Sequence, residues 1–158
     1  MELIPFLDLQ QINAAYEPQF SRKFNEFMAR GWYIMGKELE AFEQEFAQYC
    51  GVRHGIGVAN GLDALALIFR AYIEMGVLKP GDEVLVPANT YIASILAVLQ
   101  TGLVPVLCEP DAATFNLVPQ NVSRNIGPKT KAILAVHLYG QLCEMQSLAQ
   151  LAAQNGLL

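Results

Sequence analysis

Hydrophobic positions in the first fifty residues of the chain recur with the period of an α-helix. Glutamates separate four apolar residues spaced three and four apart, namely Leu39, Phe42, Phe46 and Tyr49. Side chains at this spacing share one face of a helix, so an amphipathic helix is predicted here, and Gly51 is expected to end it. Another helix is predicted over residues 16–30, and residues 31–36 link the two.

Beyond Gly51 the pattern changes to short apolar runs that alternate with helical stretches. The predicted strands are 54–59, 83–87, 104–108 and 132–136. The predicted helices are 62–74, 91–100, 119–125 and 144–153. Because the strands are continuously apolar, the pattern is typical of a parallel sheet that helices cover on both faces. The predicted fold class is therefore α/β with a mostly parallel sheet.

The last residues of the sequence read as the start of one more element. Asn155 and Gly156 form a good helix C-cap, and Leu157 and Leu158 then read as the first residues of another buried strand. A frayed apolar tail is the alternative, although solvated termini are usually more polar. We expect the sequence to stop within an element.

Composition narrows the classes of function. Hydrophobic residues make up 53% of the 158 residues, which suits a globular domain, and the mean hydropathy is +0.28. The net charge is −5 and the ten lysines and arginines are scattered, which argues against nucleic-acid binding. The most apolar run, 91–108, is interrupted by polar residues, glycine and proline, so no membrane span is expected.

The cysteines and histidines indicate a cellular compartment and argue against a metal centre. Three cysteines lie far apart in the sequence, and the N-terminus lacks the features of a signal peptide. These features predict a cytoplasmic chain with free thiols. The two histidines stand at opposite ends of predicted strands, and no cysteines are paired at ligand spacing, so no metal site is expected.

One glycine-bearing stretch, HGIGVANGLDAL at 54–65, lies where a predicted strand meets a helix. A dinucleotide fingerprint needs G-x-G-x-x-G in the turn and an acidic residue about 20 residues later, and the register here is poor. A single phosphate needs only free backbone N–H groups at a helix N-terminus, which Asn60, Gly61 and Leu62 offer. Asp63 also fits an ordinary structural cap, and the residue types alone favour the cap.

One aromatic and one imidazole side chain are candidate ligand contacts at the carboxyl ends of predicted strands, where open α/β sheets bind ligands. Thr90 is predicted to cap the helix that begins at Tyr91, which places an aromatic ring at the mouth of the crevice. This ring either stacks on a planar ligand or is simply packed. His137 follows strand 132–136, where an imidazole can act as acid, base or hydrogen-bond donor, or serve structure alone. His54, at the opposite end of its strand, is a weaker candidate.

Four segments, taken in order, resemble the amino-terminal half of the DegT-type sugar aminotransferases: GWYIMGKELEAFEQEFAQYCGVRHGIGVANGLDAL, KPGDEVLVPANTYIAS, GLVPVLCEPDAATFNLVP and KTKAILAVHLYGQ. The resemblance covers nearly the whole chain. Enzymes of this family use pyridoxal 5′-phosphate (PLP) on the fold of aspartate aminotransferase, which is fold type I. NGLDAL, TYIA and HLYGQ most resemble the enzymes that aminate a dTDP-3-keto-6-deoxyhexose.

By this resemblance the chain carries part of a PLP site. The backbone at Gly61 and Leu62 would receive the cofactor phosphate, and Tyr91 would stack on the pyridine ring. In the family a later strand delivers an aspartate that pairs with the pyridine nitrogen, and a later lysine forms the Schiff base. The lysines present, none of which matches that position, are Lys23, Lys37, Lys79, Lys129 and Lys131. The resemblance thus implies an incomplete, inactive fragment that lacks the covalent anchor of the cofactor.

Four other residues match segments that line the family's active site. His137 and Tyr139 would border the cofactor and the sugar. Trp32 and Tyr33 would lie near the active site and the subunit contact of a homodimer. No residue of this chain is assigned a catalytic step.

The implied function is PLP-dependent transfer of an amino group, with glutamate as the donor, to a dTDP-linked keto sugar in amino-sugar biosynthesis. The chain would form part of one large domain, with an N-terminal helix and active-site link over 1–36 and alternating α/β structure over 37–158. In this fold, strand 54–59 has its neighbours later in the chain, so its apolar faces are expected to be open. The alternative function is a non-catalytic α/β module that binds phosphate or cofactor, or associates with another chain.

Overall fold

The computed structural model describes residues 4–158, and the chain divides after Gly57 into two compact units. The first unit contains three helices: α1 (Leu9–Ala14), α2 (Glu17–Arg30) and α3 (Lys37–Cys50). Gly31 and Gly51 follow α2 and α3 with φ of 68° and 67°. Glycine adopts this left-handed conformation without steric cost, so it ends each helix, as expected for Gly51.

α3 carries the apolar face that its spacing predicts, but this face is largely exposed. The rings of Phe42 and Phe46 stack with their centroids 5.5 Å apart, and Tyr49 continues the row 6.4 Å from Phe46. Ala47 is the buried residue of this helix. The helix is amphipathic as predicted, and no described residue covers its aromatic side.

The predicted strand 54–59 is wrong for this chain. The segment is extended, but it pairs with no strand among residues 4–158. A strand needs a neighbour to complete its hydrogen-bonded ladder, and here the Gly57 N–H donates instead to Glu43 Oε1 at 2.6 Å. Ile56 is 81% exposed, which agrees with the expectation that the apolar faces of this segment are open.

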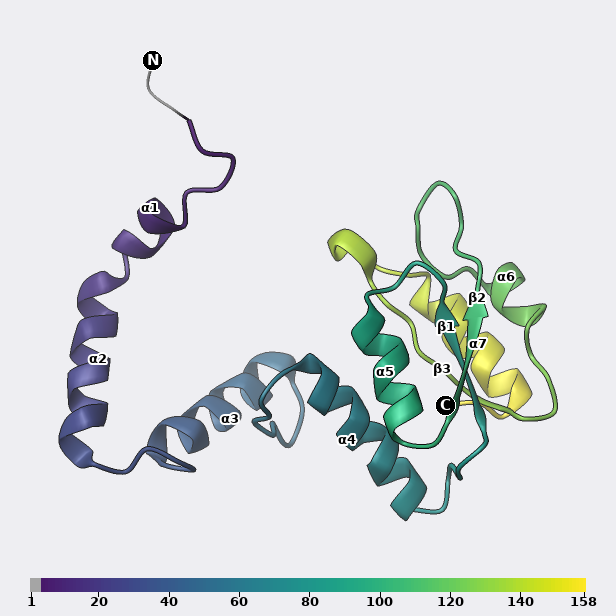
Figure 1. Ribbon diagram of the computed structural model, residues 1–158, viewed down its shortest axis with the longest axis horizontal. Coiled ribbons are helices and arrows are strands. Elements are labelled where there is room, and N and C mark those ends of the chain that lie inside the picture. Colours follow the sequence, from purple (N-terminus) through teal and green to yellow (C-terminus); the bar gives the residue numbers. More distant parts are fainter. Residues whose placement is uncertain (1–3) are drawn as a thin grey trace. The chain divides into compact units, whose positions relative to one another are not determined.

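The second unit is built on a sheet of three parallel strands in the order β2-β1-β3 (Figure 1). The strands are β1 (Glu83–Pro87), β2 (Val104–Cys108) and β3 (Thr130–Ile133). Leu85 in the central strand pairs with Val106 of β2 and Ile133 of β3. β1 is flanked on both edges and covered on both faces, so Val84, Leu85 and Val86 have no exposed surface.

Helices cover both faces of the sheet. They are α4 (Gly61–Glu74), α5 (Ile92–Gln100), α6 (Pro119–Ser123) and α7 (Met145–Asn155). Successive strand residues point to opposite faces, so Val84 and Val86 join the core beneath α4 and α5. Leu85 joins a second core that includes residues of α6 and α7. The predicted α/β class with helices on both faces is therefore confirmed for this unit.

β3 ends three residues earlier than the predicted strand 132–136. The Leu134 N–H still donates to the Leu85 carbonyl at 2.8 Å, which is the last bond of this pairing. The next donor on that side of β1 would be Pro87, which has no backbone N–H, so one bond of a continued ladder is lost. His137 consequently lies in a loop four residues beyond β3.

Leu158 forms backbone hydrogen bonds with β3, although residues 157–158 are assigned to no strand and Leu158 is 40% exposed. Its N–H donates to the Lys131 carbonyl and its carbonyl accepts from the Ile133 N–H, each at 2.9 Å. This alternating pair of bonds is the parallel-sheet pattern, so the frayed-tail alternative does not describe these residues. No helix among residues 4–158 is both long and apolar enough to cross a membrane.

Candidate functional site

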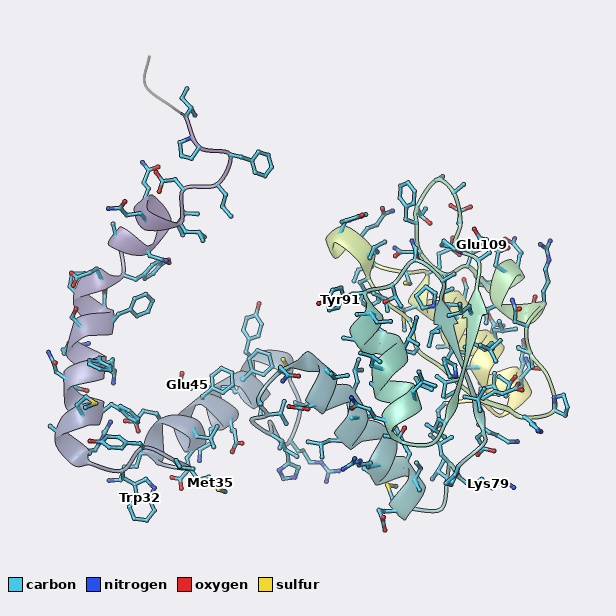
Figure 2. The ribbon with its side chains drawn as sticks, in the orientation of Figure 1. Trp32, Met35, Glu45, Lys79, Tyr91 and Glu109 are labelled. Carbon is cyan, nitrogen blue, oxygen red and sulfur yellow. The ribbon has the colours of Figure 1, made fainter. Side chains whose placement is uncertain are left out.

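The carboxyl ends of the three parallel strands meet at one edge of the second unit. The loops that leave this edge are 88–91 after β1, 109–118 after β2 and 134–144 after β3. In Figure 2, Tyr91 and Glu109 lie toward this edge and Lys79 lies toward the opposite one. Open α/β sheets bind ligands at this edge, and the loops carry three of the residues predicted from the sequence.

α4 begins with a side-chain cap. Asn60 has an extended backbone, and its Oδ1 accepts a hydrogen bond from the Asp63 N–H at 3.0 Å. Its Nδ2 donates in return to Asp63 Oδ2 at 3.0 Å. The structural cap suggested by Asn60 and Asp63 is therefore present, and it occupies the third N–H of the helix.

The cap leaves the first two N–H groups of α4 available to a ligand. Within the part of the chain that the structure describes, the amides of Gly61 and Leu62 have no hydrogen-bond acceptor. A Cβ added at Gly61 would meet no atom within 4 Å, so the space beside this residue is open. The Leu62 side chain packs on the core beneath α4 and anchors the turn. The helix end adds about half a positive charge, so these residues fit a phosphate as well as a cap.

Tyr91 is displayed at the edge of the sheet and is not packed. It is 78% exposed, and in Figure 2 its side chain projects from the start of α5. The prediction that Thr90 caps the helix is wrong, because Tyr91 itself occupies the N-cap position and its carbonyl accepts from the Ser94 N–H at 3.0 Å. The Thr90 hydroxyl lies 3.0 Å from the Ser94 hydroxyl instead. The open ring suits stacking on a planar ligand.

The loop after β3 presents His137 and Tyr139 from a tight turn, η1 (Leu138–Gly140). His137 Nδ1 accepts a hydrogen bond from the Cys143 N–H at 3.2 Å. The neutral imidazole therefore carries its proton on Nε2, which makes that atom a donor. Tyr139 is 91% exposed and adopts φ 55°. Because β3 pairs directly with β1, this loop and the Tyr91 loop leave neighbouring strands at the same edge.

Trp32 and Tyr33 lie in the first unit, in the link between α2 and α3. Trp32 Nε1 donates to the Ile34 carbonyl at 2.6 Å, and the Tyr33 hydroxyl donates to the Met28 carbonyl at 3.3 Å. Trp32 and Met35, labelled in Figure 2, line a surface cavity of about 370 Å³. Both aromatic residues are more than half exposed, so the link presents apolar surface with its backbone held in place.

Cys108 ends β2 and is buried, and this burial raises the pKa of its thiol to about 11. The thiol therefore stays protonated at neutral pH and is a poor nucleophile. Among residues 4–158, no three histidine, cysteine, aspartate or glutamate side chains are grouped to hold a metal ion.

Comparison with known proteins assigns the chain to a family. The sequence model of the DegT/DnrJ/EryC1/StrS aminotransferase family matches residues 15–158. The chain belongs to this family. A relative in it, the dTDP-3-amino-3,6-dideoxy-alpha-D-galactopyranose transaminase of Aneurinibacillus thermoaerophilus, is 52% identical over 155 residues, which are 98% of this chain and 42% of that enzyme.

Solved structures of aminotransferases share the fold of this DegT-family chain. DesV of Streptomyces venezuelae, in complex with a ketimine intermediate, is 43% identical with a TM-score of 0.90 over 99% of this chain and 41% of that one. NtdA of Bacillus subtilis, with bound cofactor PMP, is 33% identical with a TM-score of 0.88 over 99% of this chain and 36% of that one. The predicted family and its partial α/β fold are therefore confirmed. The chain spans about two fifths of the length of these relatives.

Two residues that make structural contacts were not predicted from the sequence. In the first unit, Glu43 accepts a hydrogen bond from the Gly57 N–H, and its spacing in α3 marks it only as a solvent-facing glutamate. Asn116 is 2% exposed and contacts the loop after β3. In the sequence, Asn116 is a single amide residue within the apolar run Phe115–Pro119. The spacing of apolar residues does not distinguish such a buried amide from an ordinary polar loop residue.

Proposed function

We propose that this chain supplies the phosphate-binding and ring-stacking part of a pyridoxal 5′-phosphate site in a sugar aminotransferase. The observation that carries the proposal is the pair of free amides at Gly61 and Leu62, at the start of a capped helix. A phosphate there would gain two charge-assisted hydrogen bonds and the favourable field of the helix. Membership of the DegT family, and the PMP bound to NtdA, support this choice of phosphate.

The remaining candidates of the second unit act on the ring and its surroundings. The exposed face of Tyr91 stacks on the pyridine ring, fixes its plane and shields one face from water. His137 holds a proton on Nε2 that it can donate to a ligand atom, and the Tyr139 hydroxyl borders the sugar side. When bound, PLP supplies the electron sink and carries the amino group. In the first unit, Trp32 and Tyr33 are proposed to line the active site and the contact between subunits of a homodimer.

The proposed reaction is transfer of an amino group from glutamate to a dTDP-linked 3-keto-6-deoxyhexose in the cytoplasm. The name of the Aneurinibacillus relative supports a dTDP sugar as the substrate. The resemblance places the lysine and the aspartate that complete the site outside these 158 residues, and the chain spans about two fifths of its relatives. The 158 residues alone are therefore proposed to bind the cofactor reversibly without turnover.

A chimaera tests the proposal. Residues 1–158 replace the matching part of the 52% identical relative, and the product is incubated with glutamate, PLP and the dTDP-linked 3-keto sugar. The chimaera should release 2-oxoglutarate at a rate close to that of the parent relative, because the same site is completed. A chimaera that folds and binds PLP but forms no 2-oxoglutarate would contradict the proposed reaction. The unaltered relative is the positive control.

A further inference from the structure

Asn116 is a buried amide whose two ends are both used. It lies in the loop between β2 and α6 and is 2% exposed. Its Nδ2 donates to the Gln141 carbonyl at 2.9 Å, and its Oδ1 accepts from the Leu138 N–H at 3.1 Å. These two partners stand on either side of Tyr139 and Gly140. One side chain therefore brackets the turn that carries the candidate residues after β3.

The bracketed turn is strained and needs such support. Tyr139 has φ 55° and ψ 22°, in the left-handed region that non-glycine residues rarely occupy. Its side chain is 91% exposed and contributes little packing of its own. Two backbone hydrogen bonds close the turn, from the Gly140 N–H to the His137 carbonyl and from the Gln141 N–H to the Leu138 carbonyl, each at 3.1 Å. The Asn116 side chain adds two further hydrogen bonds to this turn, and it comes from the loop after β2.

The loop that holds Asn116 is itself ordered. Asp111 Oδ1 accepts from the Thr114 N–H at 2.9 Å, the Thr114 hydroxyl at 3.1 Å and the Ala113 N–H at 3.0 Å. The Asp111 N–H donates to the Asn116 carbonyl at 3.0 Å and so closes the loop on itself. Asn116 therefore projects from a loop of fixed shape and not from a free segment.

The same loop is also tied to the loop of Tyr91. Asn89 Nδ2 donates to the Phe115 carbonyl at 3.0 Å, one residue before Asn116. Asn89 belongs to the loop after β1, and β1 is the central strand, between β2 and β3. A continuous set of contacts thus joins all three loops at the carboxyl edge of the sheet.

We infer that Asn116 is a positioning residue that sets the placement of His137 and Tyr139 relative to Tyr91. This inference rests on the proposed function for what those side chains contact. Asn116 is buried behind the turn and makes no contact with a ligand in this account. Loss of the Asn116 amide should therefore weaken binding of the pyridoxal ring. Phosphate binding at the Gly61 and Leu62 amides should stay unchanged.

The test uses Asn116→Asp, which keeps the shape and one acceptor oxygen but replaces the Nδ2 donor with an oxygen facing the Gln141 carbonyl. Repulsion between these two oxygens should displace the side chain and weaken its remaining bond to the Leu138 N–H. The matched control is Asn121→Asp, which removes an amide donor from the neighbouring Glu109 carbonyl. The full 158-residue chain is used, with amide hydrogen exchange and the affinities for PLP and for inorganic phosphate as readouts. Asn116→Asp should speed exchange at Leu138 about tenfold or more and weaken PLP binding about tenfold, with inorganic phosphate unchanged. Asn121→Asp should change none of these.

A second variant keeps the test decisive if Asn116→Asp lowers the stability of the whole chain. Asn89→Ala cuts the exposed tie to Phe115 and should speed exchange at Leu138 by a few fold without affecting β1 amides. Unchanged exchange at Leu138 in both variants, or equal losses of PLP and phosphate binding, would overturn the inference. If the unaltered chain binds no PLP, the proposed function fails, whereas the exchange data still decide whether Asn116 holds the turn.

Discussion

Replacement of Gly61 by proline removes one N–H group and tests whether that group binds phosphate. Gly61 is the first residue of α4, a position where proline is favoured because its fixed φ suits the helix. Asn60 before it has φ −165° and ψ 175°, an extended conformation that proline accepts in its neighbour. The Gly61 N–H has no acceptor among the described residues, so Gly61→Pro breaks no bond of the fold.

The expected loss of affinity follows from the number of amides. Gly61 and Leu62 offer two free N–H groups, and the proline leaves one of them and the helix field intact. A hydrogen bond to a charged group is worth about 1.5–3 kcal/mol. Binding of PLP should therefore weaken about 10- to 150-fold, since 1.4 kcal/mol is a factor of ten. The free energy of unfolding should stay the same or rise by up to about 1 kcal/mol, because proline restricts the unfolded chain.

Titration calorimetry with PLP and urea unfolding measure the two effects on the full chain. Gly61→Ala is the matched control, because it adds a Cβ in open space and keeps the N–H. The affinity difference between the alanine and proline variants isolates the N–H group. If Gly61→Pro folds normally and binds PLP as tightly as Gly61→Ala does, the phosphate is not held by this amide.

Three further outcomes follow from the structure. Gly55→Ala should lower the free energy of unfolding by about 1–3 kcal/mol, because the added Cβ would lie 2.7 Å from the Glu43 carbonyl oxygen. Urea unfolding measures this change, and an unchanged urea midpoint would contradict the close packing at Gly55. Iodoacetamide at pH 8 should modify exposed Cys50 first and buried Cys108 at least tenfold more slowly, as mass spectrometry can follow; equal rates would contradict the burial. Three hydrogen bonds, from the Thr114 amide, the Thr114 hydroxyl and the Ala113 amide, lower the pKa of Asp111. The ionised carboxylate therefore stabilises its loop fully above the ordinary aspartate pKa, and this stabilisation is lost as the pH falls through the lowered pKa. Amide exchange across pH 2–6 should show this loss, and Asp111→Asn should remove the pH dependence.

The parts of the fold that the sequence predicts well are those whose signal is local. Strand 83–87 is found with the predicted bounds, because Val84, Leu85 and Val86 form an apolar run that is buried on both faces. The helix that ends at Gly51 is equally local, since apolar spacing and a left-handed glycine define it. Both depend on residues within one element and its immediate neighbours.

Two of the three wrong predictions depend on contacts between distant segments, and the third depends on local backbone geometry. Residues 54–59 have the composition of a strand, but a strand also needs a partner, and no described residue supplies one. Beside the end of β3, Pro87 lacks an N–H for a continued ladder, and no local pattern at 132–136 reveals this residue about 46 positions earlier in the sequence. The cap at Tyr91 differs by one residue from the predicted Thr90, a choice set by backbone geometry.

In the candidate site, too, local features are predicted from the sequence and contacts between distant segments are not. Asn60 and Asp63 indicated a cap and the motif suggested a phosphate, and the structure shows that the cap leaves the amides of Gly61 and Leu62 free for a ligand. Asn116 was not predicted, because its partners lie 22 and 25 residues later in the sequence. A buried amide of this kind becomes recognisable only when the loops of separate strands are seen together.

Nuclear magnetic resonance of the full chain, labelled with ¹⁵N, shows whether the phosphate of PLP binds at the start of α4. PLP and pyridoxal, which lacks the phosphate, are titrated in parallel while the backbone amide signals are followed. We expect PLP to shift the Gly61 and Leu62 amide signals most strongly, with smaller changes near Tyr91 and His137, and pyridoxal to leave the first two signals unmoved. PLP shifts confined to other parts of the chain, or equal shifts of Gly61 and Leu62 with pyridoxal, would contradict this expectation.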